Sequence, residues 1–413
     1  MKAYKVALLL IIFLFPVNIR NEVKLSAGVS KYQINQSITY QVELNYTFTH
    51  TRSSPQSYYF KVARLNDRQP NSSLTQYCAP FQESRLLYNS IVLPNTTGND
   101  ALITNSHDRF NNTYDLFNAT LYTSNIITLS QKYIVTLNEV EFGNIQDSDI
   151  GSYDTSEEIF DLYCNRSETY YGDNYYDIND PDLIAASNRI VDPSDNPLEK
   201  ARKICTNVSS YLTYDGTLPP QEMGASWAFD NKRGDCSEYS SLMVTLLRIQ
   251  GIPARKVTGF LIETGNNMIP EVGRVFNYYA SSSGATNLLG HAWVEYYIED
   301  IGWIACEPQI AGSYKKIDSF RFNLNVGAWF FVPGASVGYD YASEFPHLPA
   351  PVASDHDAYT FNYDVKITVL ASDSMFMELI VIIIIAGVVI AVTIGVVLLI
   401  RSSRKKRKAY SNY

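Results

Sequence analysis

A cysteine, a histidine and a glutamate stand in three short segments whose local patterns could assemble a thiol nucleophile. Cys236 precedes an amphipathic run, His291 opens an alternating run, and Glu307 closes the run after it. A thiolate attacks carbonyl carbons, an imidazole removes the thiol proton, and a carboxylate holds the imidazole in one tautomer. These residue types predict nucleophilic catalysis by Cys236, with His291 as the base and Glu307 as the orienting acid.

Cys236 is predicted to occupy the first position of a buried helix. Asp235 and Glu238 fit a capping box, and apolar residues then repeat at helical spacing until Gly251 and Pro253 end the helix. A thiol at this place lies at the positive end of the helix dipole, which favours the thiolate. The free backbone N–H groups there can bind an oxyanion. The alternative is a buried structural cysteine, which is the commonest role of an isolated Cys.

The histidine and the glutamate are predicted to lie on one hairpin. Residues 291–298 alternate as a strand does, turn residues follow at 299–302, and a second strand runs from Trp303 to Glu307. This hairpin brings Glu307 near the imidazole, so that the other ring nitrogen faces the thiol. A lone strand histidine is usually structural, and it is the combination with Cys236 that indicates a site.

The two ends of the chain predict export and membrane anchoring. Lys2 and Lys5 precede an apolar run too short to span a bilayer, which is typical of a signal peptide over residues 1–21. Residues 379–400 carry no charge and would span about 33 Å as a helix. Because six cations follow directly, we expect a single-pass cell-membrane protein with a basic cytoplasmic tail at 401–413 and its catalytic domain outside.

The predicted membrane helix carries a ridge of small residues, Gly387, Ala391 and Gly395. This small-xxx-small spacing lets two helices approach closely, so a homodimer through these residues is one expectation. Small residues are also common in membrane helices that do not pair, and that alternative stays open.

Charge and residue composition limit the classes of partner expected for the part of the chain predicted to lie outside the membrane. The net charge is −9, and the exterior part is more acidic still once the cations at both ends are set aside. This disfavours nucleic acid as a partner, because phosphate binding needs a basic face. The histidines are scattered and no Cys-x-x-Cys occurs, so no metal and no cofactor is predicted. We expect an extracellular protein or peptide as the substrate.

Cysteines and glycosylation sequons give further expectations for an oxidising exterior. If Cys236 is free, the other four cysteines can form up to two disulfides. Cys78 with Cys164 is the preferred pair, because both lie in the N-terminal half. The Asn-x-Ser/Thr sequons lie in that half as well and predict a glycoprotein. Their asparagines are Asn35, Asn45, Asn71, Asn95, Asn111, Asn118, Asn165 and Asn207.

The fold class predicted for the chain is α+β. A β-sandwich-like extracellular domain is expected over residues 25–165, because several segments there alternate apolar and polar residues as strands do. A catalytic domain of helices and strands follows over 180–345, and a membrane-proximal segment over 346–378. The predicted strands of the first domain are 37–44, 58–63, 114–122 and 132–140.

Three segments, in order, resemble the transglutaminase-like superfamily of papain-type fold. They are NPLEKARKICTNVSSYLTYD from Asn196, KRGDCSEYSSLMVTLLRIQGIPARKVTGF from Lys232 and GHAWVEYYIEDIGWIACEPQ from Gly290. The resemblance implies a papain-like transglutaminase core in which the cysteine is the nucleophile, the histidine the base and Glu307 the third member. The family usually has Asp-Pro where this chain has Glu-Pro, so the charge is kept and the side chain is one methylene longer.

The same resemblance implies acyl transfer through a thioester on Cys236. Peptide hydrolysis, glutamine deamidation and Gln–Lys cross-linking share these steps, and a cell-surface cysteine peptidase or amidase is preferred because water is always available as the acceptor. A surface adhesion or envelope scaffold with an inactive core is the alternative from another class. Arg255 and Gly259 match family positions that look architectural, and Trp227 is expected to shape the cleft.

Overall fold

The structure is a computed structural model in which all described helices and strands belong to one unit. The chain divides into residues 1–31 and 32–413, and the elements lie in the second unit. The predicted signal peptide and the predicted membrane span, apart from residues 392 and 393, lie outside the described residues. Within the described part of the chain, no helix is long and apolar enough to cross a membrane. The described residues are 31–65, 78–94, 102–107, 110–165, 169–170, 173–174, 176–218, 222–262, 269–327, 350–352, 359–374 and 392–393.

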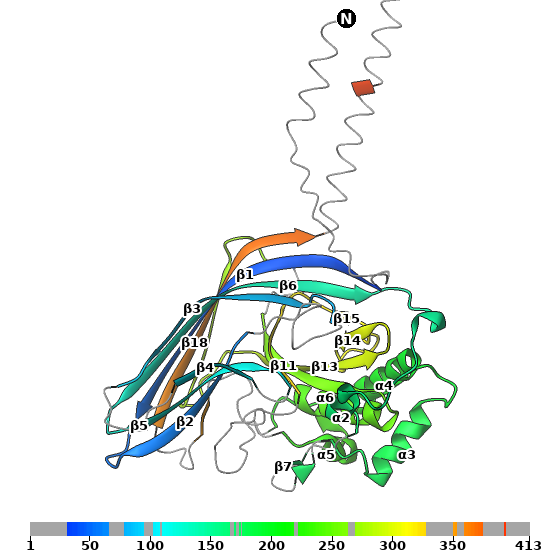
Figure 1. Cartoon of the computed structure of the whole chain (residues 1–413), viewed down its shortest axis with the longest axis horizontal. Helices are drawn as coiled ribbons and strands as arrows, with labels where there is room; N and C mark the ends of the chain where they lie inside the picture. The colour runs from blue at the N-terminus through cyan, green and yellow to red at the C-terminus, as the bar shows by residue number, and fades with distance from the viewer. Residues whose placement is uncertain are drawn as a thin grey trace, which may run out of the picture. The chain divides into compact units, whose positions relative to one another are not determined.

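The described elements form several sheets and a group of helices (Figure 1). The helices are η1 (Asp147–Asp149), α2 (Glu158–Tyr163), α3 (Pro181–Ile190), α4 (Pro197–Tyr211), α5 (Ala225–Asn231) and α6 (Cys236–Ile249). The strands up to residue 234 are β1 (Tyr32–His50), β2 (Gln56–Ala63), β3 (Gln82–Val92), β4 (Leu102–His107), β5 (Thr113–Leu121), β6 (Ile126–Phe142), β7 (Thr169–Tyr170), β8 (Asp173–Asn174), β9 (Thr213–Tyr214) and β10 (Arg233–Gly234). The later strands are β11 (Ala254–Leu261), β12 (Val275–Ser281), β13 (Gly290–Ile298), β14 (Gly302–Cys306), β15 (Lys316–Ile317), β16 (Arg321–Val326), β17 (Ala350–Val352) and β18 (Tyr359–Ser374).

Long strands from both ends of the described chain share one six-stranded sheet. Its order is β12-β18-β1-β6-β15, and β3 also pairs with β6. Along β1, every second residue from Gln36 onward is buried, which is the alternation that predicted this strand. Strand β18 therefore lies beside β1 of the N-terminal part, and β12 extends the same sheet on the other side of β18.

A second sheet, β17-β2-β5-β4, completes the β-rich part. Its apolar side chains join those of the six-stranded sheet in one hydrophobic cluster. Phe48 of the six-stranded sheet meets Phe60 of the second sheet, with ring centroids 4.9 Å apart, and Phe60 stacks on Phe117 within its own sheet at 4.5 Å. The four predicted strands are confirmed, because three fall within β1, β2 and β6 and the fourth, 114–122, matches β5 up to its last residue, Leu121.

The strands that carry the histidine and the glutamate belong to a four-stranded sheet, β14-β13-β11-β16. Helix α6 packs against β11 and β13, and Figure 1 shows α3, α4 and α5 gathered near it. Tyr40 of β1 meets Phe322 of β16, with ring centroids 5.2 Å apart. All residues of β13 after Gly290 are buried, as expected for a strand covered by other elements on both faces.

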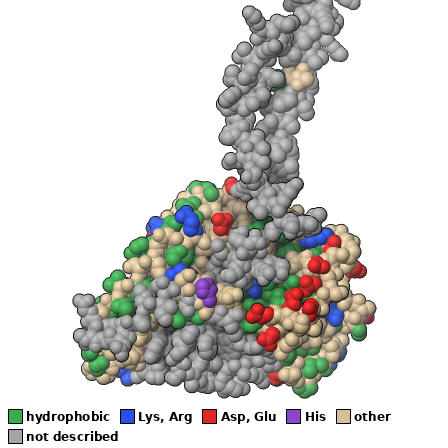
Figure 2. Space-filling model, viewed as in Figure 1, with side chains coloured by type: hydrophobic (Ala, Val, Ile, Leu, Met, Phe, Trp, Pro, Cys, Tyr) green, Lys and Arg blue, Asp and Glu red, His purple; other side chains and the backbone are tan. Residues whose placement is uncertain are grey.

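Acidic side chains gather over the helical part of the molecule on the face drawn in Figure 2. The stretch from the end of β6 through α2 exposes the acidic side chains Asp147, Asp154, Glu157, Glu158 and Asp161. This surface would repel other anionic surfaces at low salt.

Gly259→Ala is expected to destabilise the folded chain by about 3 kcal/mol or more, because overpacking forces the backbone to move. A Cβ at Gly259 would lie 1.7 Å from the Phe322 carbonyl oxygen on the neighbouring strand β16. That atom belongs to a backbone and cannot rotate away.

Urea unfolding of Gly259→Ala and of Gly216→Ala measures this difference. A Cβ at Gly216 meets the exposed Tyr214 ring at 3.3 Å, and this side chain can move aside. The control should therefore stay within about 1 kcal/mol of wild type. Equal losses in both variants would refute the packing role of Gly259.

Candidate active site

Cys236 is the first residue of α6, as the sequence predicts. The Asp235 side chain accepts the backbone N–H of Ser237 at 2.7 Å. The Glu238 carboxylate accepts the backbone N–H of Asp235 at 3.0 Å. These bonds confirm the predicted capping box. They satisfy donors that a helix start leaves free, and so fix the turn that carries the thiol.

A buried ion pair holds the chain before α5 against α6. The Glu222 carboxylate accepts the Ser241 hydroxyl and pairs with the Lys256 ammonium of β11. All three side chains are buried. The second Glu238 oxygen accepts the Met223 backbone N–H at 2.9 Å. These contacts fix the position of α6 relative to its sheet, and no sequence pattern indicated them.

His291 and Glu307 are in direct contact, as predicted. In the hairpin of β13 and β14, Val294 lies opposite Cys306, so Glu307 follows directly after the last paired residue. Residues alternate between the two faces of a strand, which puts Glu307 on the same face as His291. The imidazole Nε2 lies 2.7 Å from Glu307 Oε2, and both side chains are buried. Because Nε2 contacts Glu307, Nδ1 is the ring nitrogen of His291 that can contact another group.

Arg321 belongs to the same buried polar group, and sequence reasoning missed it. Its guanidinium pairs with the Glu307 oxygen that contacts His291. It also pairs with Asp318 at 2.9 Å and lies 5.9 Å from the Trp293 ring centroid. Burial raises the pKa of Glu307, but the His291 hydrogen bond and the Arg321 charge lower it to about 2. The carboxylate is therefore ionised throughout the neutral range.

The Cys236 thiol lies beside the first residues of β13. The backbone N–H of Ala292, the residue after His291, is close enough to act on the thiol and lower the pKa of Cys236. Cys236 is partly exposed, whereas the other four cysteines are buried. The arrangement offers a reachable thiol beside the strand that carries His291, whose Nε2 is held by a carboxylate.

The resting thiol is less acidic than its helix position predicts. Burial is the largest cause that raises the pKa of Cys236. The carboxylates of Asp235, Glu307 and Glu238 raise it further. A helix dipole contributes about 0.3–1 kcal/mol, which is less than one pKa unit at about 1.4 kcal/mol. The dipole does not outweigh burial and three carboxylates, so the thiol rests neutral and needs a base.

The predicted disulfide between Cys78 and Cys164 is wrong. The structure holds no bond between Cys78 and Cys164. The Cys78 sulfur lies 3.6 Å from Arg255 Nη2. The Cys164 thiol points to the Arg248 carbonyl oxygen, 3.8 Å away. The two thiols have different buried neighbours, which their shared place in the N-terminal half did not reveal.

Two aromatic side chains lie on the elements before the nucleophile. Trp227, predicted to shape the cleft, is half-buried in α5, and the Arg233 guanidinium lies 5.5 Å from its ring centroid. Tyr214 is 61% exposed on β9, which pairs with β10 directly before Cys236. Burial and then the nearby Cys236 raise the pKa of Tyr214. Tyr214 is therefore a site neighbour that sequence reasoning missed.

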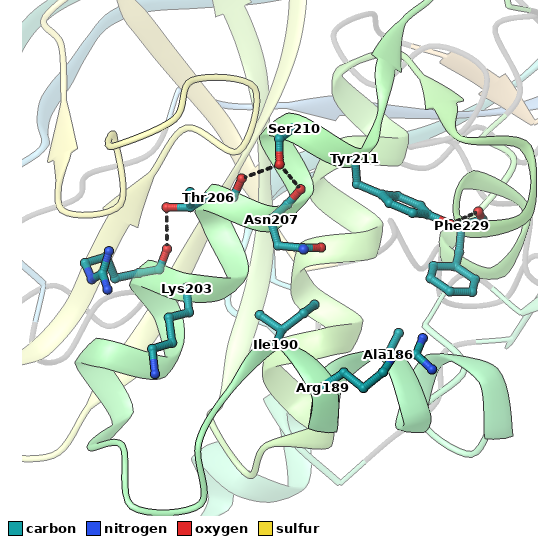
Figure 3. A pocket seen from close by; sticks show the side chains of 10 residues that line it. Ala186, Arg189, Ile190, Lys203, Thr206, Asn207, Ser210, Tyr211 and Phe229 are labelled. Atoms are coloured by element: carbon teal, nitrogen blue, oxygen red, sulfur yellow. Dashed lines mark hydrogen bonds between the residues drawn. The ribbon is translucent and has the colours of Figure 1, made fainter.

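A cavity of about 620 Å³ lies between α3, α4 and α5 (Figure 3). None of the three candidate catalytic residues lines it. Its aromatic wall is Tyr211 stacked on Phe229 at 5.2 Å. Two of its cations, Arg202 and Lys203, are paired with carboxylates.

Within the described residues, no group of three or more His, Cys, Asp or Glu side chains could hold a metal ion.

The stretch that carries the site matches a known family. Residues 184–308 match the transglutaminase-like superfamily. This part of the chain is a transglutaminase-like domain. It includes Cys236, His291 and Glu307, whereas Arg321 lies beyond the matched residues. This domain mixes helices and strands.

Curated relatives match part of this chain. A Bacillus subtilis protein, the uncharacterized protein YebA, is 31% identical over 153 residues, which are 35% of this chain and 20% of that protein. A protein-glutamine gamma-glutamyltransferase of Pseudomonas aeruginosa is 30% identical over 106 residues, which are 25% of this chain and 14% of that protein. The chain thus spans 20% or less of the length of either relative.

Solved structures give weaker similarity. A candidate cysteine protease from Cytophaga hutchinsonii has a TM-score of 0.47 at 12% identity, covering 83% of this chain and 93% of that chain. Red sea bream transglutaminase has a TM-score of 0.22 at 15% identity, covering 75% of this chain and 58% of that chain.

Glu238 is expected to make the stability of the transglutaminase-like domain depend on pH. Burial and the Asp235 charge raise the pKa of Glu238 from 4.5 to about 7. The folded chain then binds this proton more tightly than the unfolded chain does. Its stabilising effect is fully present below about pH 4.5 and is lost as the pH rises through about 7. At about 1.4 kcal/mol per pKa unit, the loss is at most about 3 kcal/mol.

Urea unfolding at pH 5 and pH 8 measures this effect in wild type and in Glu238→Gln. The variant has no proton to release at this position, so its free energy of unfolding should change less between the two pH values. Glu157→Gln, at an exposed position, should keep the wild-type difference. The role of Glu238 is refuted when all three proteins show the same change.

Proposed function

We propose that this chain is a cell-surface thiol acyl-transfer enzyme, a cysteine peptidase or amidase that acts on extracellular protein. The observation that carries the proposal is the contact of 2.7 Å between His291 Nε2 and Glu307 Oε2. A partly exposed thiol lies nearby, because the backbone N–H of the residue after His291 is close enough to lower the pKa of Cys236. Cys236, His291 and Glu307 then act as nucleophile, base and orienting acid.

The proposed reaction needs no group beyond these side chains, the substrate and water. His291 Nδ1 takes the thiol proton while Cys236 Sγ attacks the amide carbonyl carbon. The C–N bond then breaks, the imidazolium gives its proton to the leaving amine, and the acyl group stays on sulfur as a thioester. Water attacks the thioester with His291 as base, and the C–S bond breaks to give a carboxylic acid and the free thiol.

The surroundings support two further tasks in this reaction. Glu307, ionised and buried, stabilises the imidazolium that forms in both steps. The Asp235 side chain takes up the next backbone N–H groups of the first turn of α6, so the Cys236 backbone N–H is the group there that can donate to the developing oxyanion. Because burial keeps the thiol neutral, proton removal by His291 accompanies the attack and does not precede it.

Glutamine transglutaminase or deamidase activity is the second candidate. It is favoured by the 30% identity of part of this chain to the gamma-glutamyltransferase of Pseudomonas aeruginosa. The thioester would form from a glutamine side chain with loss of ammonia, and an amine or water would accept the acyl group. The covalent step on Cys236 is the same, so the acceptor separates the candidates.

Cys236→Ala is expected to lower the activity of the full-length chain by about 10⁴-fold or more, because the thioester cannot form. Peptides and glutamine-containing proteins are incubated with wild type or variant, and peptide cleavage, ammonia release and amine incorporation are followed. Cleavage that is lost in the variant supports the peptidase. Loss of ammonia release or amine incorporation supports the second candidate.

A control and a probe without substrate complete this test. Cys164→Ala removes a buried thiol that lies beside Arg248, at the opposite end of α6 from Cys236, and should keep the activity. Iodoacetamide should alkylate Cys236 faster than the other thiols of the folded chain. Absence of all three reactions, together with an unreactive Cys236, would favour a surface scaffold with an inactive core.

The location outside the cell is part of the proposal. It is supported by the uncharged run 379–400 and the cations that follow it. It is also supported by the sequons, because no described sequon asparagine is buried. Proteolysis of intact cells should remove the transglutaminase-like domain, and protection of this domain would place it inside. The described asparagines of these sequons are Asn35, Asn45, Asn111, Asn118, Asn165 and Asn207.

A further inference from the structure

Two buried thiols meet next to the candidate active site. Cys205 of α4 and Cys306, the last residue of β14, have sulfur atoms 3.4 Å apart, and neither residue is exposed. The Cys205 sulfur also lies 3.9 Å from the Glu307 carbonyl oxygen. The two thiols therefore bring α4 into contact with the residue directly before Glu307. The Glu307 carboxylate is the group that contacts His291.

A short approach of the two sulfur atoms would allow a disulfide bond between Cys205 and Cys306. Disulfide sulfurs lie about 2.05 Å apart, so the two atoms have to approach by about 1.4 Å. The remaining cysteines have other neighbours. Cys78 contacts Arg255, and Cys164 contacts a backbone carbonyl. In the folded chain, Cys205 and Cys306 are thus the cysteines placed to bond with each other.

We propose that Cys205 and Cys306 form a disulfide when the chain folds in an oxidising compartment, and that the bond fixes the end of β14 beside Glu307. The two thiols lose two protons and two electrons as the S–S bond forms. A small disulfide such as oxidised glutathione takes them up and is reduced to two thiols. The proposed catalytic thiol, Cys236, takes no part.

The bond forms before packing is complete. Thiol–disulfide exchange needs a thiolate and access to the oxidant. In the folded chain both thiols are fully buried, and burial raises the pKa of Cys306. The folded, reduced protein therefore resists oxidation, whereas a chain that folds with an oxidant present closes the bond as α4 meets β14.

Peptide mapping of the full-length chain tests the proposal. One sample is refolded with reduced and oxidised glutathione, the other with a phosphine reductant throughout. Both are then denatured in iodoacetamide, digested and analysed by mass spectrometry. The first sample should contain a peptide pair linked through Cys205 and Cys306, with Cys236 alkylated. The second should carry alkyl groups on all five cysteines. The bond is read by mass, so the result does not depend on catalytic activity.

The thermal midpoint gives an independent readout. The bond would close a loop between residues 101 positions apart, and the oxidised sample should melt about 5 °C or more above the reduced one. Cys306→Ala should abolish this difference, and Cys78→Ala should keep it. Full alkylation of Cys205 and Cys306 in the oxidised sample, or a link to another cysteine, would overturn the proposal.

Discussion

Glu307→Gln is expected to lower kcat/KM of the acyl-transfer reaction by about 10³-fold while the chain stays folded. The Glu307 oxygen that faces His291 also receives Arg321, and an amide oxygen at that place can accept both donors. The substitution therefore removes the negative charge but lets the hydrogen bonds from His291 and Arg321 remain. A charge pair at 4 Å is worth about 4 kcal/mol in a protein environment, and the imidazolium formed during attack loses this stabilisation.

Steady-state kinetics of Glu307→Gln and Glu307→Asp measures the effect. The aspartate keeps the charge with a shorter side chain, so its loss should be at most about 10-fold. The rate at which iodoacetamide alkylates Cys236 near neutral pH gives a second readout, and it should fall in the glutamine variant alone. A glutamine variant that matches wild type in both measurements would remove Glu307 from the reaction.

Arg255→Met is expected to lower the free energy of unfolding by about 3–5 kcal/mol, because it takes one partner out of a buried ion pair. The Arg255 guanidinium lies 2.8 Å from Glu295 Oε2, and both side chains are 1% exposed. It also lies 3.8 Å from the Trp303 ring centroid and contacts Cys78. Its removal leaves the Glu295 carboxylate buried without this cation.

Urea unfolding of Arg255→Met, Glu295→Gln and the double variant separates charge from packing. If the buried charge dominates, the double variant should be more stable than Arg255→Met alone, because the amide needs no cation. Arg64→Met breaks the pair with buried Asp115 in the β-rich part and gives a comparison at a second buried carboxylate. A loss below about 1 kcal/mol for Arg255→Met would show that the pair contributes no more than a surface salt bridge.

The sequence was sufficient where a signal is local along the chain. The capping box places Cys236 at the start of α6, because its bonds join residues at most three apart. Alternation identifies β13, and a short turn returns the chain, so that Glu307 reaches His291. The resemblance to the transglutaminase-like superfamily rests on the same segments and agrees with the match over residues 184–308.

Only the tertiary structure decided which distant side chains meet. Arg321 contacts Glu307 from β16, beyond the family match, and a guanidinium shows no periodicity that would place it there. Cys205 and Cys306 are neighbours although 101 positions separate them, whereas the predicted cysteine pair has other partners. The acidity of Cys236 likewise depends on the tertiary structure. The helix start was readable from the sequence, but the burial and the Glu307 charge that oppose a thiolate come from packing. Local hydrogen bonds are fixed by residues a few positions apart, while burial and charge contacts depend on how the whole chain packs.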